Sequence, residues 1–152
     1  MPQMSKATWD RRFLQLAETI AQWSKDPSTK VGAVIVRPNK TIVSLGYNGF
    51  PRGVRDTTAM YEDRPKKYQR IVHAEANAIV SAAEPLTGYT IYSHPLPVCN
   101  ECMKLVIQSG ITRCVSIALT PPEVERWAES LRVAREMAEQ ANVEIAYLPR
   151  GK

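Results

Sequence analysis

Two short clusters of reactive side chains stand out in this chain of 152 residues, because the residue types that bind metal ions are otherwise scarce. The sequence has two histidines, His73 and His94, and three cysteines. His73 lies two positions before Glu75, and Cys99 and Cys102 form a C-x-x-C pair. These spacings suggest that an imidazole, a carboxylate and two thiols belong to one active site.

One imidazole and two thiolates suit a catalytic Zn²⁺ ion whose fourth position stays open for water. A carboxylate that lies beside such an ion without ligating it can carry protons. The pattern therefore predicts one zinc ion per chain, bound by His73, Cys99 and Cys102, with Glu75 as the acid–base residue. An H-x-E motif followed by C-x-x-C is typical of zinc deaminases that act on nucleobases. Either half alone is weak, since a lone C-x-x-C also suits a redox pair or half of a structural zinc site.

Each cluster is predicted to lie at the start of a helix. The first helix should begin near His73 and stop at Pro85, and the second should begin at Cys99 and end at Gly110, a residue type common after a last helical turn. Unpaired amides and the helix dipole favour negative charge at these ends. That environment would help to hold the two cysteines as thiolates.

The periodicity of the remaining chain predicts one α/β domain over residues 1–152, in the order α-β-β-α-β-α-β-α-β. The expected helices span residues 8–24, 73–85, 99–110 and 122–142, and the expected strands span 31–36, 41–47, 89–93, 111–119 and 143–148. Residues 48–70 show no clear period and are predicted to form a long loop. The last helix is long enough for a crossover, so the two strands around it are predicted to be parallel.

Composition excludes several classes of protein. The chain is 44% apolar and 23% charged, close to the mean for soluble globular proteins, and no apolar run approaches the ~18 residues of a membrane span. An odd cysteine count and no apolar secretory segment favour a cytoplasmic protein without disulfides or membrane contact. Residues 37–70 hold eight basic and three acidic residues, and thus the whole net charge of +5. That charge suits a solvated surface or an anionic partner, either a nucleotide phosphate or a nucleic-acid backbone.

Four segments resemble the deoxycytidylate (dCMP) deaminases of the cytidine-deaminase-like zinc deaminase superfamily, namely residues 24–36, 46–51, 72–79 and 99–111. The resemblance implies a three-layer α-β-α cytidine-deaminase-like fold with a five-stranded mixed sheet. It also implies zinc-dependent hydrolysis of dCMP to dUMP and ammonia, which feeds thymidylate synthesis. One residue departs from the family pattern: Val98 stands where the family has proline directly before the first metal cysteine.

The resemblance also assigns residues to substrate binding, namely Asn48, Ala74, Ser24 and Lys25. Asn48 would contact the sugar hydroxyl, and the Ala74 backbone would contact the pyrimidine edge. Asn48 equally suits a turn that needs a positive φ, and the two roles can coexist.

Long relatives of this type are homo-oligomers, often hexamers, which dCTP activates and dTTP inhibits at a site between subunits. By resemblance the effector would contact Gly46, Tyr47, Asn48, Gly49, Arg52 and Arg70. A triphosphate effector would bring Mg²⁺ with it, and the glycines at 46, 49 and 53 would give the segment the backbone freedom of a switch.

Two alternatives stay open on the residues alone. A zinc deaminase of tRNA adenosine or of single-stranded DNA would also use this motif, although the basic segment offers few aromatic residues for base stacking, and no nucleic-acid partner is expected. A non-catalytic zinc-binding module would keep the ligands without needing Glu75. His94 is predicted to line the pocket rather than to bind metal, and Cys114 is predicted to be a core residue of a strand.

Overall fold

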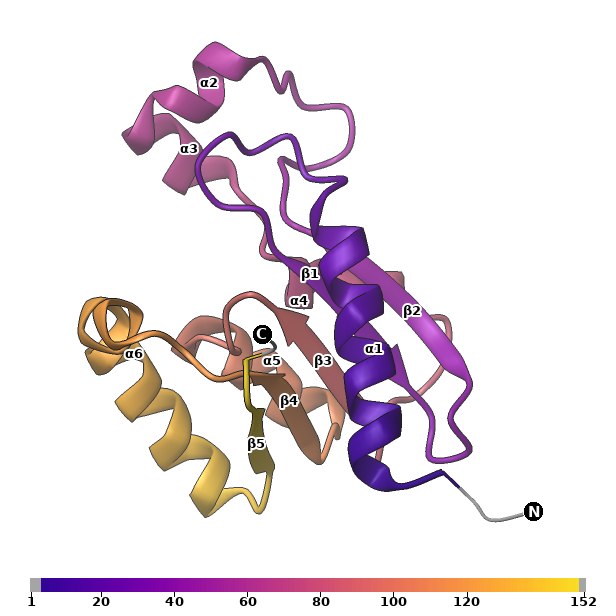
Figure 1. The fold of residues 1–152 in the computed structure, drawn as a ribbon. Coiled ribbons are helices and arrows are strands. Elements are labelled where there is room, and N and C mark those ends of the chain that lie inside the picture. The colour runs from indigo at the N-terminus through magenta and orange to yellow at the C-terminus, as the bar shows by residue number, and fades with distance from the viewer. Residues whose placement is uncertain (1–3, 151–152) are drawn as a thin grey trace.

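Five strands form one mixed sheet with helices on both faces (Figure 1). The computed structural model describes residues 4–150. The strands are β1 (Gly32–Val36), β2 (Ile42–Tyr47), β3 (Thr90–His94), β4 (Arg113–Ile117) and β5 (Glu144–Leu148). The helices are α1 (Lys6–Ala21), α2 (Thr58–Glu62), α3 (Arg64–Arg70), α4 (Ala74–Ser81), α5 (Asn100–Ser109) and α6 (Pro121–Gln140).

The strand order across the sheet is β2-β1-β3-β4-β5. β1 pairs antiparallel with both β2 and β3, whereas β3–β4 and β4–β5 are parallel. A parallel neighbour needs a crossover connection, and α5 and α6 supply the two that this half of the sheet requires. The predicted five-stranded mixed sheet with parallel last strands is confirmed.

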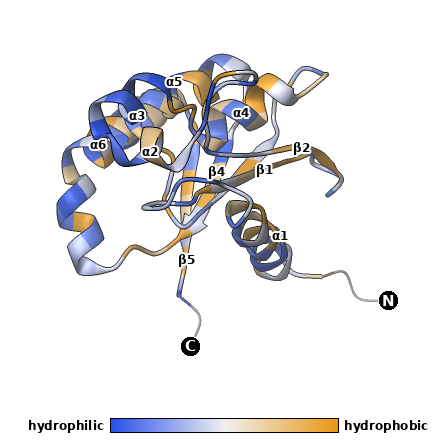
Figure 2. Cartoon of the chain, turned by 90° about the horizontal axis from the view of Figure 1, so that it is seen from above, coloured by the Kyte–Doolittle hydropathy of each residue, from blue (hydrophilic) through white to orange (hydrophobic). Residues whose placement is uncertain are grey.

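Side chains that alternate along the strands divide the interior into two cores. Ala33 and Ile35 of β1 face one buried cluster, which α4, α5 and α6 cover, while Val34 and Val36 face another beneath α1. Figure 2 shows α1 alone on one side of the strands, with α4, α5 and α6 on the other. This arrangement is the predicted three-layer α-β-α fold.

Two helices approach the sheet so closely that a side chain would collide with their backbone. A Cβ added to Gly32 of β1 would lie 2.6 Å from the Ala21 nitrogen of α1. A Cβ added to Gly46 of β2 would lie 2.6 Å from the Ala74 carbonyl oxygen of α4. Glycine at both positions therefore sets the helix-to-sheet spacing, and on the second face that helix begins directly after His73.

The prediction of a long loop over residues 48–70 was wrong, because the segment contains α2 and α3. The Thr57 side chain accepts a hydrogen bond from the Met60 amide and caps α2, and Asp63 likewise caps α3 through the Lys66 amide. Helices of five and seven residues are too short to show a hydrophobic period. We call residues 58–70 the α2–α3 arm; in Figure 1 it projects beyond one end of the sheet.

The segment that contains the arm, residues 50–71, begins and ends close to one point on the body of the protein. Gly49 and Val72 form an isolated antiparallel bridge, in which each amide donates to the other residue's carbonyl oxygen, at 3.1 and 2.7 Å.

Two other helices end earlier than expected: α1 ends at Ala21 rather than 24, and α4 ends at Ser81 rather than 85 because Ala82 is already extended. No helix within residues 4–150 combines the length and the apolarity needed to cross a bilayer.

Candidate active site

The N-termini of α4 and α5 bring the predicted metal ligands together. His73 is the N-cap of α4, and Cys99 is the N-cap of α5, with Cys102 in the first turn that follows. The His73 Nδ1 atom lies 3.5 Å from Cys99 Sγ and 3.3 Å from Cys102 Sγ. All three ligand atoms lie within 4.8 Å of one another.

These separations fit Zn²⁺. Zinc–sulfur bonds of about 2.3 Å and zinc–nitrogen bonds of about 2.0 Å at tetrahedral angles place nitrogen and sulfur roughly 3.5 Å apart. The pKa of the Cys99 thiol is lowered to about 4, first because the Cys102 thiol donates a hydrogen bond to it and then because of His73. Cys99 is therefore in the thiolate form that binds metal, whereas the hydrogen bond to Cys99 and burial raise the pKa of the Cys102 thiol, whose proton metal binding would displace. Three protein ligands leave one tetrahedral position free.

Glu75 lies beside this cluster without belonging to it. Its side chain is in the first turn of α4 and is only 4% exposed. Burial raises the pKa of the Glu75 carboxyl to about 7, and the charge of Cys99 adds to the shift. A carboxyl that titrates near neutral pH can both accept and donate a proton during a reaction.

A cavity of about 240 Å³ opens onto His73, Glu75 and Cys99. The helices α3 and α6 supply much of the remaining lining, with Arg64, Lys67, Tyr68, Arg126, Trp127, Ser130 and Leu131. Because α3 belongs to the arm and α6 is the last crossover helix, the cavity joins parts of the chain that lie far apart in sequence.

Two of the basic lining residues have no carboxylate partner. Arg64 donates a hydrogen bond to the Tyr68 hydroxyl at 3.2 Å, and the Arg126 guanidinium lies 5.2 Å from the centre of the Trp127 ring. Neither guanidinium forms an ion pair with any carboxylate of residues 4–150. Lys67 differs, since its ammonium group lies 2.7 Å from Asp26. The cavity therefore has positive charge available for an anionic ligand.

Comparison with known proteins identifies the family. The family model of the cytidine and deoxycytidylate deaminase zinc-binding region matches residues 7–118. The chain belongs to this deaminase family. An "uncharacterized deaminase in luxG 3′ region" of Aliivibrio fischeri is 44% identical to this chain over 141 residues, which are 93% of this chain and 94% of that protein.

Other relatives carry substrate names. A probable deoxycytidylate deaminase of Drosophila melanogaster is 35% identical over 95% of this chain and 74% of its own length. The human deoxycytidylate deaminase is 39% identical over 70% of this chain and 63% of its own length. Among solved structures, the cyanophage S-TIM5 dCMP deaminase in complex with dCMP and dUMP aligns with a TM-score of 0.73 at 25% identity. That alignment covers 96% of this chain and all of the phage chain. The predicted fold, family and enzyme class, a deaminase, are confirmed.

Asn48 lines the cavity of the deaminase and is buried. Its Oδ1 accepts a hydrogen bond from the Val31 amide at 2.9 Å, and its Nδ2 donates to the Thr29 carbonyl at 2.9 Å and to Asp26 Oδ2 at 3.3 Å. Both amide hydrogens are thus in use, and the spare capacity of the carboxamide lies on Oδ1. The alternative interpretation as a turn residue with positive φ was wrong, because Asn48 does not have one.

The other predicted substrate residues differ in their placement. Ala74 is fully buried at the start of α4 and lines the cavity. Ser24 lies behind Asn48, to whose carbonyl its hydroxyl donates at 2.7 Å, so the structure gives it a supporting position. Lys25 lies outside the cavity, and its ammonium group pairs with Asp56 at 3.1 Å. The structure therefore brings Asn48 and Ala74 to the site and does not bring Lys25.

The predicted effector residues differ in their surroundings. Exposed Tyr47 contacts the exposed Trp23 ring edge-on at 6.2 Å, while Arg52 is exposed on the loop that leads into the arm. Arg70 donates to the Lys66 carbonyl on its own helix. Backbone freedom does not explain the glycines either, since Gly53 alone of the three has a positive φ, at 82°, and Gly46 is required by the close approach of α4.

Three further residues complete the comparison with the sequence. The prediction that His94 lines the pocket was wrong: its Nε2 atom lies 3.7 Å from Glu18 of α1, on the other side of the sheet. Cys114 is a buried residue of β4, as predicted. Val98 is buried in the core, and Cys99 directly after it still caps α5, so the departure from proline leaves the ligand geometry intact.

Sequence reasoning did not assign four charged cavity residues, namely Asp26, Arg64, Lys67 and Arg126. Asp26 directly follows Ser24 and Lys25, which the resemblance singled out, so its place in the segment 24–36 was the available signal. Arg64 and Lys67 lie in the basic segment 37–70, but its charge excess did not single them out, and Arg126 on α6 carried no signal, because the local sequence does not determine where these helices lie.

Proposed function

We propose that this deaminase hydrolyses dCMP to dUMP and ammonia. The observation that carries the proposal is the buried Glu75 carboxyl beside a His/Cys/Cys ligand set, in a cavity that also holds two unpaired arginines. The names of the curated relatives and the nucleotides bound by the phage enzyme support the same substrate.

The residues of the chain divide the chemistry between them. His73, Cys99 and Cys102 would hold a zinc ion, which would supply a Lewis acid that acidifies a water molecule. Glu75 accepts one proton of that water and passes it to the ring nitrogen, and it then carries the second proton, from the hydroxyl newly bonded to the ring carbon, to the departing amine. The water oxygen becomes the carbonyl oxygen of uracil, and the amine leaves as ammonia, so no redox partner is needed. The Ala74 backbone orients the pyrimidine edge.

The remaining groups suit the sugar and the phosphate. Asn48 has only its Oδ1 atom available, so it accepts a hydrogen bond from the sugar hydroxyl. Arg64 and Arg126 hold the 5′-phosphate, because guanidinium groups make charge-assisted pairs with phosphate oxygens and these two have no competing carboxylate. A nucleotide rather than a free nucleoside is therefore the proposed substrate.

The test is ammonia release from cytosine, deoxycytidine, CMP, dCMP and dCTP side by side, with a cytosine-containing single-stranded oligonucleotide for the nucleic-acid alternative. We expect dCMP to have the highest kcat/KM. Glu75→Gln should retain zinc and bind dCMP while kcat falls at least about 10²–10⁴-fold, the range of general acid–base catalysis. A Glu75→Gln variant with a tenth of the wild-type kcat would show that another group moves the protons. Preference for deoxycytidine or the oligonucleotide would overturn the substrate.

We further propose that the enzyme is a cytoplasmic homohexamer that supplies thymidylate synthesis, activated by dCTP with Mg²⁺ and inhibited by dTTP. The exposed Trp23–Tyr47 pair and the basic side chain of Arg52, which lie outside the cavity, support an interface with a triphosphate. An effector must bind one state better than another, with a typical coupling of about 1–3 kcal/mol. The expected dCMP saturation curve is sigmoidal, hyperbolic with dCTP and shifted to higher substrate by dTTP. A hyperbolic curve that neither triphosphate moves would remove the regulation and leave the catalysis.

A further inference from the structure

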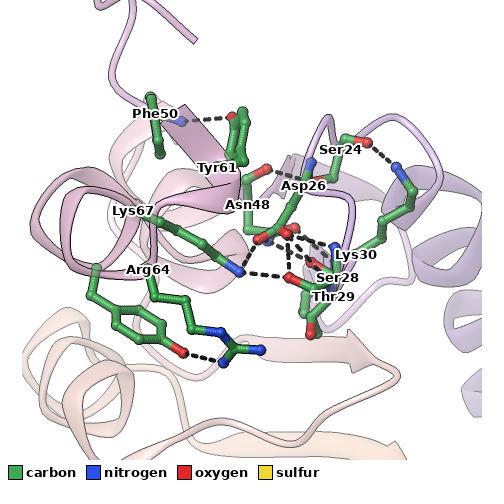
Figure 3. Close-up of polar contacts among 12 residues, drawn as sticks. Ser24, Asp26, Ser28, Thr29, Lys30, Asn48, Phe50, Tyr61, Arg64 and Lys67 are labelled. Carbon is green, nitrogen blue, oxygen red and sulfur yellow. Dashed lines mark hydrogen bonds and ion pairs between the residues drawn. The ribbon is translucent and has the colours of Figure 1, made fainter. Parts of the chain in front are cut away.

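We propose that Lys67 of the α2–α3 arm is a positioning residue, which fixes the substrate-facing carboxamide of Asn48 through the carboxylate of Asp26. The proposal rests on dCMP deamination as the function of the cavity. Figure 3 shows the ammonium group of Lys67 reaching Asp26 and Ser28, with Asn48 beside them.

The contact between Lys67 and Asp26 is buried and direct. Lys67 Nζ lies 2.7 Å from Asp26 Oδ2 and donates a hydrogen bond to Ser28 Oγ at 3.1 Å. The side chains of Lys67 and Asp26 are only 10% and 1% exposed. An ammonium group buried to this extent needs its carboxylate partner, and an unpaired carboxylate would bear the full cost of its desolvation.

The Asp26 carboxylate passes this constraint to Asn48. Its Oδ1 accepts from the Ser28 amide at 2.9 Å and from the Thr29 amide at 3.3 Å, so the carboxylate cannot rotate freely. Its Oδ2, the oxygen that Lys67 contacts, accepts from Asn48 Nδ2 at 3.3 Å. Burial alone would raise the pKa of Asp26, but the hydrogen bonds from Lys67, Ser28 and Thr29 outweigh burial and lower it.

An ionised Asp26 sets the direction of the Asn48 carboxamide. A carboxylate only accepts hydrogen bonds, so it must face Nδ2 and never Oδ1. The Thr29 carbonyl imposes the same choice on the second amide hydrogen, and the Val31 amide takes one acceptor position on Oδ1. Without Lys67, Asp26 would take up a proton or water, and it would then no longer discriminate between the two ends of the carboxamide.

The arm has a second contact that holds this geometry. The Tyr61 ring of α2 stacks on Phe50 with centroids 4.2 Å apart, and the Tyr61 hydroxyl accepts a hydrogen bond from the Phe50 amide at 3.3 Å. The arm therefore contacts two segments next to Asn48. One is Phe50, two positions further along the chain, and the other is residues 26–28, in which Asp26 accepts the hydrogen bond from Asn48. Lys67 is the point at which the arm contacts a residue of the substrate cavity through charge.

The molecule offers a matched control for a purely structural ion pair. Arg113 of β4 and Asp10 of α1 lie 2.7 Å apart with side-chain exposures of 13% and 7%, and neither residue lines the cavity. Lys66, the exposed neighbour of Lys67 on α3, is a control for loss of a positive charge from the arm.

The experiment compares Lys67→Met, Arg113→Met and Lys66→Met as zinc-loaded enzymes, with Tm, kcat and KM for dCMP measured at a temperature where all are folded. We expect the first two substitutions to lower Tm. Lys67→Met alone should lower kcat/KM about 10–100-fold, chiefly through KM, because a misplaced contact to the sugar weakens binding before chemistry. Wild-type KM in folded Lys67→Met, or an equal rise of KM in Arg113→Met, would overturn the positioning role.

If Lys67→Met does not fold, Lys67→Gln is measured in its place, since a neutral amide can still donate to Asp26. A smaller but clear rise of KM is then expected, and a KM equal to that of wild type would overturn the proposal. The wild-type enzyme tests the function separately. If it does not turn over dCMP, the proposed substrate fails whatever the variants do, and the comparison is made on the substrate that it does use.

Discussion

The two sides of the sheet share two structural features, a helix packed against a glycine and a buried ion pair, but only one side carries the active-site cavity. On each side a helix approaches a strand so closely that only glycine fits, at Gly32 beneath α1 and at Gly46 beneath α4. Each side also has one well-buried ion pair, Asp10–Arg113 on the α1 side and Asp26–Lys67 on the cavity side.

The neighbours of the two ion pairs make the difference. Asp10 also accepts a hydrogen bond from the buried Tyr92 hydroxyl at 2.6 Å, so its network joins α1 to the sheet and lies outside the lining of the active-site cavity. Asp26 is bonded to Asn48, which lines the cavity. The same interaction therefore stabilises the fold on one side and, as we propose, also orients a ligand on the other.

The largest effect is expected at the metal centre, where substitutions of two buried cysteines on the cavity side, Cys102 and Cys114, should have different results. Cys102 and Cys114 are 3% and 4% exposed, but Cys102 alone belongs to the ligand cluster. Cys102→Ala should lose bound zinc and lower kcat about 10³-fold or more, since a metal ion supplies several kcal/mol of stabilisation to the transition state. Cys114→Ala should keep its zinc despite the small cavity it creates. Metal analysis after dialysis decides, and unchanged zinc in Cys102→Ala would refute the ligand assignment.

The two glycines test whether the α1 side is only structural. Gly46→Ala and Gly32→Ala should each destabilise the fold by about 1–3 kcal/mol through overpacking. Gly46→Ala should also lower kcat/KM of the folded enzyme, because it displaces α4, which carries Glu75. Urea unfolding and steady-state kinetics on the same samples separate the two effects. An equal loss of kcat/KM in folded Gly32→Ala would show that the α1 side is not only structural and also affects the active site.

The unpaired arginines should have a smaller effect, confined to substrates that carry a phosphate. Arg64→Gln and Arg126→Gln are each expected to raise KM for dCMP about 3–10-fold, in line with a charge-assisted hydrogen bond at an exposed position. Turnover of deoxycytidine should be unchanged. Arg132 on α6, which pairs with Glu129 and Glu136, provides the control substitution Arg132→Gln. A rise of KM that is the same for deoxycytidine would show that the arginines do not contact the phosphate.

The smallest effect is a pH dependence of stability. The pKa of Asp10 lies below its ordinary value of 3.8, because hydrogen bonds from Arg113 and Tyr92 outweigh its burial. A lowered carboxyl pKa contributes stability that is complete above the unfolded pKa and is lost as the pH falls through the folded one. The stability gap between wild type and Asp10→Asn should therefore be constant above about pH 5 and narrow below about pH 4. Urea midpoints measure the gap, and one that widens in acid would contradict this assignment.

The parts of the site that could be predicted from sequence are those in which the chemistry is local. His73 and Glu75, like Cys99 and Cys102, are separated by two or three positions, and helix N-termini fix their relative placement. The strands were equally accessible, because each is a short segment with β-branched or aromatic residues between turns or helices.

The outer part of the cavity could not be predicted, since its contacts join distant segments. Lys67 meets Ser28, a residue 39 positions away, and a buried lysine runs against the usual exposure of its type. The two short helices of the arm are fixed by their caps at Thr57 and Asp63 rather than by any period. His94 was misplaced for a related reason: the sequence put it after a strand, but the strand's alternation decides which face it reaches.

The bridge between Gly49 and Val72 has a consequence for how this enzyme can diverge. Because the two ends of residues 50–71 meet there, that segment is a module whose exchange leaves the chain entering His73 at the same place. Closing a longer loop over the same two ends costs little, about 0.6 kcal/mol for each doubling of length. Natural variation or grafting can therefore replace the whole arm, and with it the cavity residues Arg64 and Lys67, while the metal ligands and Glu75 are inherited intact.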